Sequence, residues 1–185
     1  MSDQNLIKIW DLPIRIFHWL LVVGFFAAYL TEDELLDVHV WAGYLVLFLV
    51  VFRLIWGFVG SQYARFSQFL CSPKQSFAYL QALIQGKAQR YLGHNPAGAL
   101  MIVLLLIFLI GTSLTGIAVY GADQGLGPLA SIGPEHEDLW EETHEFFANS
   151  TLILVGVHVL GVIVESLIHK ESLVRAMLSG YKKSN

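Results

Sequence analysis

The chain has 185 residues and a formal net charge of −4, with 55% hydrophobic and only 14% charged residues. Soluble domains carry about 25% charged residues, so this composition, with a mean hydropathy of +0.58, argues against a soluble globular protein. The acidic balance also gives no basic surface for nucleic acid, and the length fits one membrane domain over residues 1–185.

Four apolar segments are each long enough to cross a hydrocarbon core of about 30 Å. They cover residues 12–30, 38–59, 96–120 and 143–168, and they predict an all-α fold, an integral membrane four-helix bundle. Between the second and third segments, Phe77, Leu80 and Ile84 recur at helical spacing. This pattern predicts an amphipathic helix over residues 73–85 that lies along the membrane interface.

Charge is divided between the two sides of the predicted bundle. All 11 basic residues lie toward one side, whereas the connections 31–37 and 121–142 hold acidic residues and no basic one. Because the cytoplasmic flanks of membrane helices collect Lys and Arg, both termini are predicted to be cytoplasmic (N-in, C-in). Lys182 and Lys183 are interpreted as a solvated tail, and the lone Cys71 as a reduced cytoplasmic thiol.

Four histidines fall inside or at the mouths of the apolar segments, where an ionisable side chain is costly unless it binds a ligand or carries protons. At a rise of about 1.5 Å per residue, His18 and His158 reach a similar depth on the inner side. His39 and His144 lie level with each other on the outer side. The spacing therefore predicts two pairs, His18 with His158 and His39 with His144.

Two facing imidazoles are the protein ligands that a six-coordinate haem iron needs, whereas zinc usually takes three or four protein ligands at one site. The four histidines are therefore predicted to be the axial ligands of two b haems. Two alternatives stay open: the residues at the mouths could be ordinary interface residues, and the deeper pair could form a proton relay. Five small residues would leave room for the macrocycle: Gly24, Ala42, Gly43, Gly156 and Gly161. Five aromatic residues would line its site: Phe17, Trp19, Trp41, Phe146 and Phe147.

Other polar residues give further expectations. Propionates of the inner haem would find one of three arginines: Arg15, Arg53 or Arg65. The outer connections offer no Lys or Arg, so outer propionates must use hydroxyls, ring N–H groups, backbone or water. Three further histidines are interpreted as surface residues: His94, His136 and His169. His94 and Asn95 could instead contact a quinone head group, although capping of the helix at Pro96 is the simpler interpretation.

Four stretches occur together in this chain: Asp11-Leu-Pro-Ile-Arg-Ile-Phe-His18-Trp, His39-Val-Trp-Ala-Gly43 followed by Arg53-Leu-Ile-Trp-Gly, Gly93-His-Asn-Pro-Ala-Gly98, and His144-Glu-Phe-Phe with His158. In this combination the chain resembles, over nearly its whole length, the bacterial cytochrome b561 and nickel-iron hydrogenase b-type cytochrome family. The resemblance implies a four-helix bundle in the bacterial inner membrane that binds two b haems through His18, His158, His39 and His144.

The resemblance also implies electron transfer in a respiratory chain, between a quinone pool and a partner such as a periplasmic cytochrome c or a hydrogenase-type protein. No catalytic side chain is expected apart from the ligands. Whether such a protein is an electron carrier or a subunit of a quinone oxidoreductase stays open.

Two other functions also stay open. A free-standing enzyme of the same scaffold would oxidise superoxide and reduce quinone, although the acidic outer side would repel that anion. A haem-free proton or metal transporter is disfavoured by the four-helix size and the matched depths of the histidines. The acidic stretch 135–145 could dock a basic electron carrier, or could only reflect the sorting of basic residues to the other side.

Overall fold

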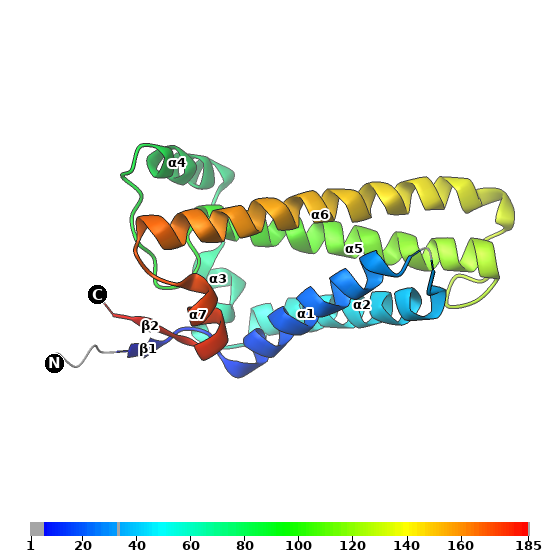
Figure 1. The fold of residues 1–185 in the computed structure, drawn as a ribbon, viewed down its shortest axis with the longest axis horizontal. Coiled ribbons are helices and arrows are strands. Elements are labelled where there is room, and N and C mark those ends of the chain that lie inside the picture. Colours follow the sequence, from blue (N-terminus) through cyan, green and yellow to red (C-terminus); the bar gives the residue numbers. More distant parts are fainter. Residues whose placement is uncertain (1–5, 33, 185) are drawn as a thin grey trace. The chain divides into compact units, whose positions relative to one another are not determined.

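The computed structural model describes residues 6–32 and 34–184. Its long helices are α1 (Leu12–Leu30), α2 (Leu36–Val59), α5 (Pro96–Gln124) and α6 (Glu137–Ile168) (Figure 1). Each of them is long and apolar enough to cross a membrane. Within the described residues, the prediction of an all-α protein with four candidate spans is confirmed. α1 has the predicted bounds, whereas the other three helices run beyond their predicted segments, most of all α6, which begins at Glu137 rather than at residue 143.

The remaining elements are short: β1 (Leu6–Lys8), η1 (Gln62–Ala64), α3 (Phe66–Phe69), α4 (Pro73–Ile84), η2 (Pro134–His136), α7 (Leu173–Ser179) and β2 (Tyr181–Lys183). The chain divides into two compact units whose boundaries cross the long helices. The first unit comprises Met1–His18, Arg53–Val103 and Gly156–Asn185, and the second comprises Trp19–Phe52 and Leu104–Val155. Each unit contains one of the two predicted histidine pairs.

In the first unit, Asp11 starts α1 and ties it to α2. Its Oδ1 accepts a hydrogen bond from the backbone N–H of Ile14 at 2.8 Å, and its Oδ2 accepts one from the indole N–H of Trp56 at 3.0 Å. Burial alone would raise the pKa of Asp11, but hydrogen bonds from Ser61, Ile14 and Trp56 outweigh it and hold that pKa below its usual value. The carboxylate is therefore charged at neutral pH and fully engaged at a helix N-terminus, where negative charge is favourable.

A short antiparallel ribbon joins the two ends of the described chain in the first unit. Ile7 of β1 lies opposite Lys182 of β2. Beside it, the carbonyl oxygen of Gly180 accepts hydrogen bonds from the backbone N–H groups of Ile9 and Trp10, at 2.8 and 3.1 Å. Gly180 ends α7 with a φ of 90°, and a Cβ there would lie 2.7 Å from the Trp10 carbonyl oxygen. Only glycine satisfies both the backbone conformation and this close approach.

Arg15 holds the C-terminal end of α7. Its Nε donates a hydrogen bond to the carbonyl oxygen of Met177 at 3.3 Å, and its Nη2 donates one to the carbonyl oxygen of Leu178. A cation is favourable at this end of a helix because the last carbonyl groups have no partner within it. One of the three arginines predicted to bind propionates is therefore already engaged in the fold.

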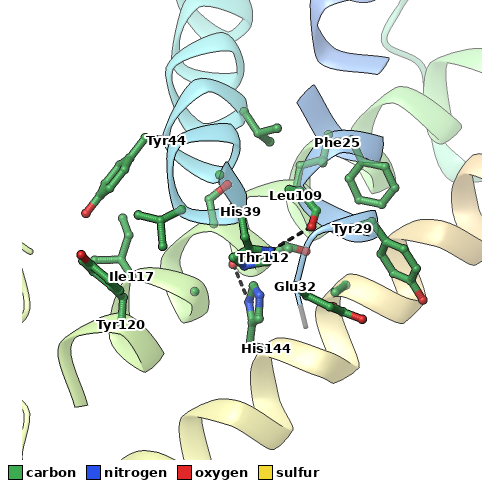
Figure 2. A pocket seen from close by; sticks show the side chains of 17 residues that line it. Phe25, Tyr29, Glu32, His39, Tyr44, Leu109, Thr112, Ile117, Tyr120 and His144 are labelled. Carbon is green, nitrogen blue, oxygen red and sulfur yellow. Dashed lines mark hydrogen bonds between the residues drawn. The ribbon is translucent and has the colours of Figure 1, made fainter. Parts of the chain in front are cut away.

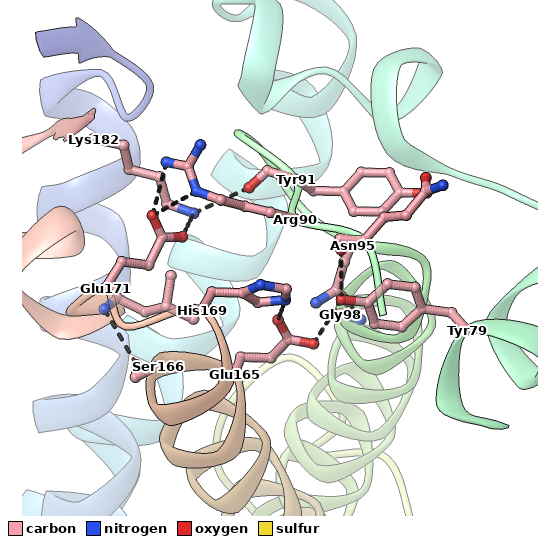
Figure 3. Close-up of polar contacts among 12 residues, drawn as sticks. Tyr79, Arg90, Tyr91, Asn95, Gly98, Glu165, Ser166, His169, Glu171 and Lys182 are labelled. Carbon is pink, nitrogen blue, oxygen red and sulfur yellow. Dashed lines mark hydrogen bonds and ion pairs between the residues drawn. The ribbon is translucent and has the colours of Figure 1, made fainter. Parts of the chain in front are cut away.

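Glu171 forms ion pairs with two basic side chains in the first unit (Figure 3). Its Oε2 lies 2.9 Å from Arg90 Nη2, and its Oε1 lies 2.8 Å from Lys182 Nζ. Lys182 is only 6% exposed and also donates to the carbonyl oxygen of Tyr91 at 3.3 Å, so the interpretation of this residue as part of a solvated tail is wrong. Burial raises the pKa of Glu171, but the hydrogen bonds and charges of Lys182 and Arg90 lower it further, and the net shift is downward.

The amphipathic helix predicted over residues 73–85 is present as α4. It begins with a capping box in which the Ser72 hydroxyl accepts from the N–H of Gln75 and the Gln75 side chain accepts from the N–H of Ser72. Its buried face carries Tyr79, whose hydroxyl donates to Glu165 at 2.8 Å. The three predicted apolar residues point away from the protein, with exposed fractions of 65% for Phe77, 37% for Leu80 and 88% for Ile84. An apolar face without a protein partner is what a helix in the membrane interface requires.

In the second unit, α5 and α6 approach each other closely. The fully buried Thr151 hydroxyl donates to the carbonyl oxygen of Phe147 at 2.8 Å and lies 3.2 Å from the Thr112 hydroxyl. A Cβ on Gly111 would lie 2.4 Å from the Phe147 ring. A glycine and a pair of hydroxyl groups thus form the contact between these helices, as is typical of packing within membranes.

The substitution Glu171→Gln is expected to destabilise the first unit. It removes charge-assisted hydrogen bonds worth about 1–3 kcal/mol and leaves the buried Lys182 without its counter-ion. Because the pKa of Glu171 is lowered from 4.5 on folding, its contribution is complete at neutral pH and is lost as the pH falls through the folded pKa. Thermal unfolding in detergent should show a lower Tm than the parent at pH 7 and a smaller difference near pH 4. Glu135→Gln is the control, since that side chain is 69% exposed; equal effects of the two substitutions would contradict the account.

Candidate functional site

The structure brings the four predicted histidines together in two pairs. In the second unit, the ring centroids of His39 and His144 lie 6.0 Å apart, with an angle of 87° between the ring planes. In the first unit, the centroids of His18 and His158 lie 6.4 Å apart, at 53°. Each pair joins residues from two different helices that are more than 100 positions apart in the chain.

These separations fit a metal ion between the two rings of each pair. With a metal–nitrogen bond of about 2 Å on either side, two imidazoles on opposite faces of one iron place their centroids about 6 Å apart. No group of three or more His, Cys, Asp or Glu side chains suited to a metal was found among residues 6–32 and 34–184. Two protein ligands at each site match haem iron, whose other four ligands come from the porphyrin, better than zinc.

Hydrogen bonds fix the orientation of both rings in the second unit (Figure 2). His39 Nδ1 lies 2.9 Å from the carbonyl oxygen of Ala28, and His144 Nδ1 lies 3.0 Å from that of Thr112 and 3.2 Å from the Thr115 hydroxyl. A carbonyl oxygen can only accept, so Nδ1 carries the proton in both rings. Each Nε2 therefore keeps its lone pair for a metal, the arrangement found for most metal-bound histidines.

A pocket surrounds this pair and is lined by aromatic and small residues. Among those labelled in Figure 2 are Phe25, Tyr29, Tyr44 and Tyr120. Gly43 also lines it, and a Cβ added there would meet no atom within 4 Å. The buried Ser113 hydroxyl faces the same pocket without a hydrogen-bond partner in the described part of the chain. Open space beside a glycine and an unpaired buried hydroxyl are both expected where a large cofactor with polar groups binds.

The aromatic residues of this pocket differ from those that the sequence predicted. Trp41 and Phe146 do not line it and are 74% and 60% exposed. The sequence analysis did not predict the three tyrosines that line the pocket, Tyr29, Tyr44 and Tyr120. Their positions near the predicted outer ends of the spans could have indicated them. Among the described residues that line the pocket there is no Lys or Arg, and the hydroxyl groups come from Tyr, Ser and Thr.

The first unit, which holds His18 and His158, also contains glycines with open space beside them and a buried cation. Two helical glycines near His158, Gly156 and Gly161, have open space where a Cβ would stand. Arg53 is only 4% exposed, with its guanidinium carbon 4.7 Å from the centroid of the Phe66 ring. The first unit therefore combines open space along the helix of His158 with a buried cation.

Two histidines interpreted as surface residues are not on the surface. The His94 ring packs against Trp10, with centroids 4.6 Å apart, and its Nδ1 atom is buried. Burial lowers the pKa of His94 to about 3, and nearby positive charge, first from Arg53, adds to the effect. The His169 side chain is 11% exposed and lies 3.2 Å from Glu165 (Figure 3).

The substitution Gly116→Ala tests whether the His144 ring must keep its position. A Cβ at residue 116 would lie 2.9 Å from Cε1 of His144, so the ring has to shift. We expect loss of the b-haem spectrum assigned to the His39/His144 pair, or a shift in its absorption maximum. Gly24→Ala is the matched control, because Gly24, although predicted to leave room for the macrocycle, does not line the pocket, and a Cβ there makes only ordinary contacts, the nearest at 3.4 Å. Identical spectra for the parent, Gly116→Ala and Gly24→Ala would contradict a ligand role for this ring.

Comparisons with known proteins agree with these features. The chain is similar to proteins named probable Ni/Fe-hydrogenase B-type cytochrome subunit. That of Rhizobium leguminosarum bv. viciae is 24% identical over 219 residues, covering 96% of this chain and 89% of the relative. That of Azotobacter vinelandii is 23% identical over 224 residues, covering 98% of this chain and 90% of the relative. That of Cupriavidus necator is 24% identical over 214 residues, covering 94% of this chain and 86% of the relative. No solved structure matches the chain. Residues 9–180 match the family described as prokaryotic cytochrome b561, and the chain belongs to that family of membrane cytochromes.

Proposed function

We propose that this protein is a dihaem b-type cytochrome that carries electrons across the bacterial inner membrane, between a quinone pool and a partner redox protein. The observation that carries the proposal is the presence of two separate histidine pairs, each with ring centroids 6.0 to 6.4 Å apart. Family membership implies haem b, and this group supplies reversible one-electron chemistry at its iron. His18 with His158 and His39 with His144 would be the axial ligands.

The chain's own residues position and tune these groups. The carbonyl oxygens of Ala28 and Thr112 hold the protons of His39 and His144 on Nδ1, which orients both Nε2 atoms and makes the rings more basic. Aromatic side chains line much of the pocket that would hold the group of His39 and His144. Tyr29 stays in place because its hydroxyl donates to Asn149 at 2.8 Å. None of these residues needs to change its protonation state for an electron to pass.

The proposal includes the orientation of the chain in the membrane. In the predicted arrangement all 11 basic residues lie on the side that holds both termini, and this bias supports termini in the cytoplasm. The first unit, with His18 and His158, would then face the cytoplasm, and the loop that contains η2 would face the periplasm. The quinone is a proposed substrate on family grounds, and we assign it no side chain.

The proposed partner is a hydrogenase-type protein, because the relatives are named as hydrogenase cytochrome subunits. A periplasmic cytochrome c is the other partner that the chemistry allows. The acidic residues of the η2 loop and of the start of α6 are available for such a contact, since Glu135, Asp138, Glu141, Glu142 and Glu145 are all exposed. Clustered negative charge speeds association with a basic partner.

Histidine substitutions test the two-haem assignment. His18→Ala and His144→Ala should each lose one of two b haems, and the lost haems should differ in spectrum or potential, because each substitution removes a ligand from a different pair. Reduced-minus-oxidised absorption spectra with haem quantified per chain make the measurement. His136→Ala, in the exposed loop, is the control and should keep both haems. A parent with no haem, or a haem content that neither ligand substitution changes, would refute the proposal.

Ionic strength tests the docking of a basic electron carrier. The rate of haem reduction by a basic cytochrome c should fall as salt rises from about 0.01 M to about 0.15 M, where charges are screened beyond about 8 Å. The double substitution Glu141→Gln and Glu142→Gln should weaken this salt dependence. Lys87→Gln, at an exposed residue on the basic side, is the control. A rate that is independent of salt in the parent would rule out electrostatic docking.

A further inference from the structure

Arg53 is a buried cation without a complete set of partners. The residue is 4% exposed within α2, and its Nη1 atom is buried with no hydrogen-bond partner among the described residues. Its guanidinium carbon lies 4.7 Å from the centroid of the Phe66 ring and 5.9 Å from that of Phe69. Ring faces stabilise a cation only in part, and arginine stays charged in proteins. Within an apolar span such a group needs an anion.

The nearest acidic residue does not supply that anion directly. Asp11 attracts Arg53 electrostatically, but its Oδ1 is bound to the N–H of Ile14 and its Oδ2 to the indole of Trp56. Asp11 and Arg53 form no ion pair in the part of the chain that the structure describes. A hydrogen-bonding position on Arg53 Nη1 therefore remains for a group that the chain itself does not provide.

His94 offers a second unused polar atom in the same unit. Its ring lies between two aromatic rings, with centroids 4.6 Å from Trp10 and 4.7 Å from Phe69. Its Nδ1 is buried without a hydrogen-bond partner among the described residues. Because burial and nearby positive charge keep the pKa of His94 at about 3, the ring is neutral at pH 7. A neutral imidazole carries one N–H, which it can donate to an anion.

His94 lies close to Arg53 and within electrostatic range of the first histidine pair. Both contact Phe69, and His94 is within electrostatic range of Arg53, His158 and His18. The other two arginines that the sequence predicted as partners of the inner haem propionates do not fit that role. Arg15 is engaged with carbonyl oxygens of α7, and Arg65 is exposed.

We propose that Arg53 and His94 together bind a carboxylate, namely a propionate of the haem held by His18 and His158. Arg53 forms the ion pair, and His94 donates a hydrogen bond from Nδ1. This assignment rests on the proposed function and adds two binding residues to it. It also makes the two haem sites unlike in charge, because the pocket of His39 and His144 has no Lys or Arg in its lining.

The direct test compares haem b with its dimethyl ester, in which both propionates are uncharged. Apoprotein is reconstituted with each, and the affinity at each site is followed by its absorption spectrum. In the parent, the His18/His158 site should prefer the acid over the ester by about tenfold or more, the scale of a charge-assisted hydrogen bond. The preference should fall severalfold in Arg53→Gln and in His94→Leu, while the other site is unchanged. Arg65→Gln and His136→Leu are the matched controls and should behave as the parent.

Redox titration gives a second readout. Loss of the Arg53 charge should lower the equilibrium constant for reduction of one haem by about tenfold, which corresponds to about 59 mV for one electron, and leave the other haem unchanged. If both variants keep the parent's acid preference and both potentials, the proposal is wrong. If the variants do not fold, the parent protein alone gives the test. An equal preference for haem b over its dimethyl ester at the two sites would then overturn the assignment. Absence of two haems in the parent would instead refute the proposed function.

Discussion

The second unit depends on giving each of its two imidazoles within the apolar helices, His39 and His144, a use for both ring nitrogens. In the second unit, backbone carbonyl groups take the Nδ1 protons of His39 and His144, and the Nε2 atoms remain for a metal. The carbonyl of Thr112 accepts from the His144 ring in addition to its place in α5, and the Thr115 hydroxyl lies 3.2 Å from the same nitrogen, so α5 alone orients the ring. A small residue must then stand beside the ring, and Gly116 meets that need. Under the proposed function, ligation would offset the cost of a polar group in the membrane.

The first unit is organised by charges instead. Asp11, Arg15 and Glu171 each bind groups from a different segment: Asp11 binds the indole of α2, Arg15 binds the end of α7, and Glu171 binds Arg90 and Lys182. Together with the ribbon of β1 and β2 they fix the segments that flank His18 and His158. Arg53 and His94 differ from these residues because each keeps a buried nitrogen that has no hydrogen-bond partner in the described part of the chain. That difference between satisfied and unsatisfied polar groups distinguishes residues that hold the fold from residues that we assign to a ligand.

Much of the fold and the pairing of the histidines could be predicted from sequence. Apolar length fixes the spans, and the constant helical rise converts sequence position into depth, so the levels of His18 and His158 and of His39 and His144 followed from counting. Residues whose role depends on loop folding could not be found in this way. His94 is buried because its loop brings it between Trp10 and Phe69, and Lys182 because the chain end returns to Glu171. The tyrosines of the pocket were missed because depth alone does not say which face of a helix lines it.

The central claim is that each histidine pair ligates one haem. Near-infrared magnetic circular dichroism of the fully oxidised protein tests it most directly, because the energy of the ligand-to-iron transition identifies the axial ligands. With haem quantified on the same sample, the account predicts two haems per chain, both low-spin and both with two histidine ligands. A high-spin haem, a histidine–methionine signal or a single haem per chain would contradict it.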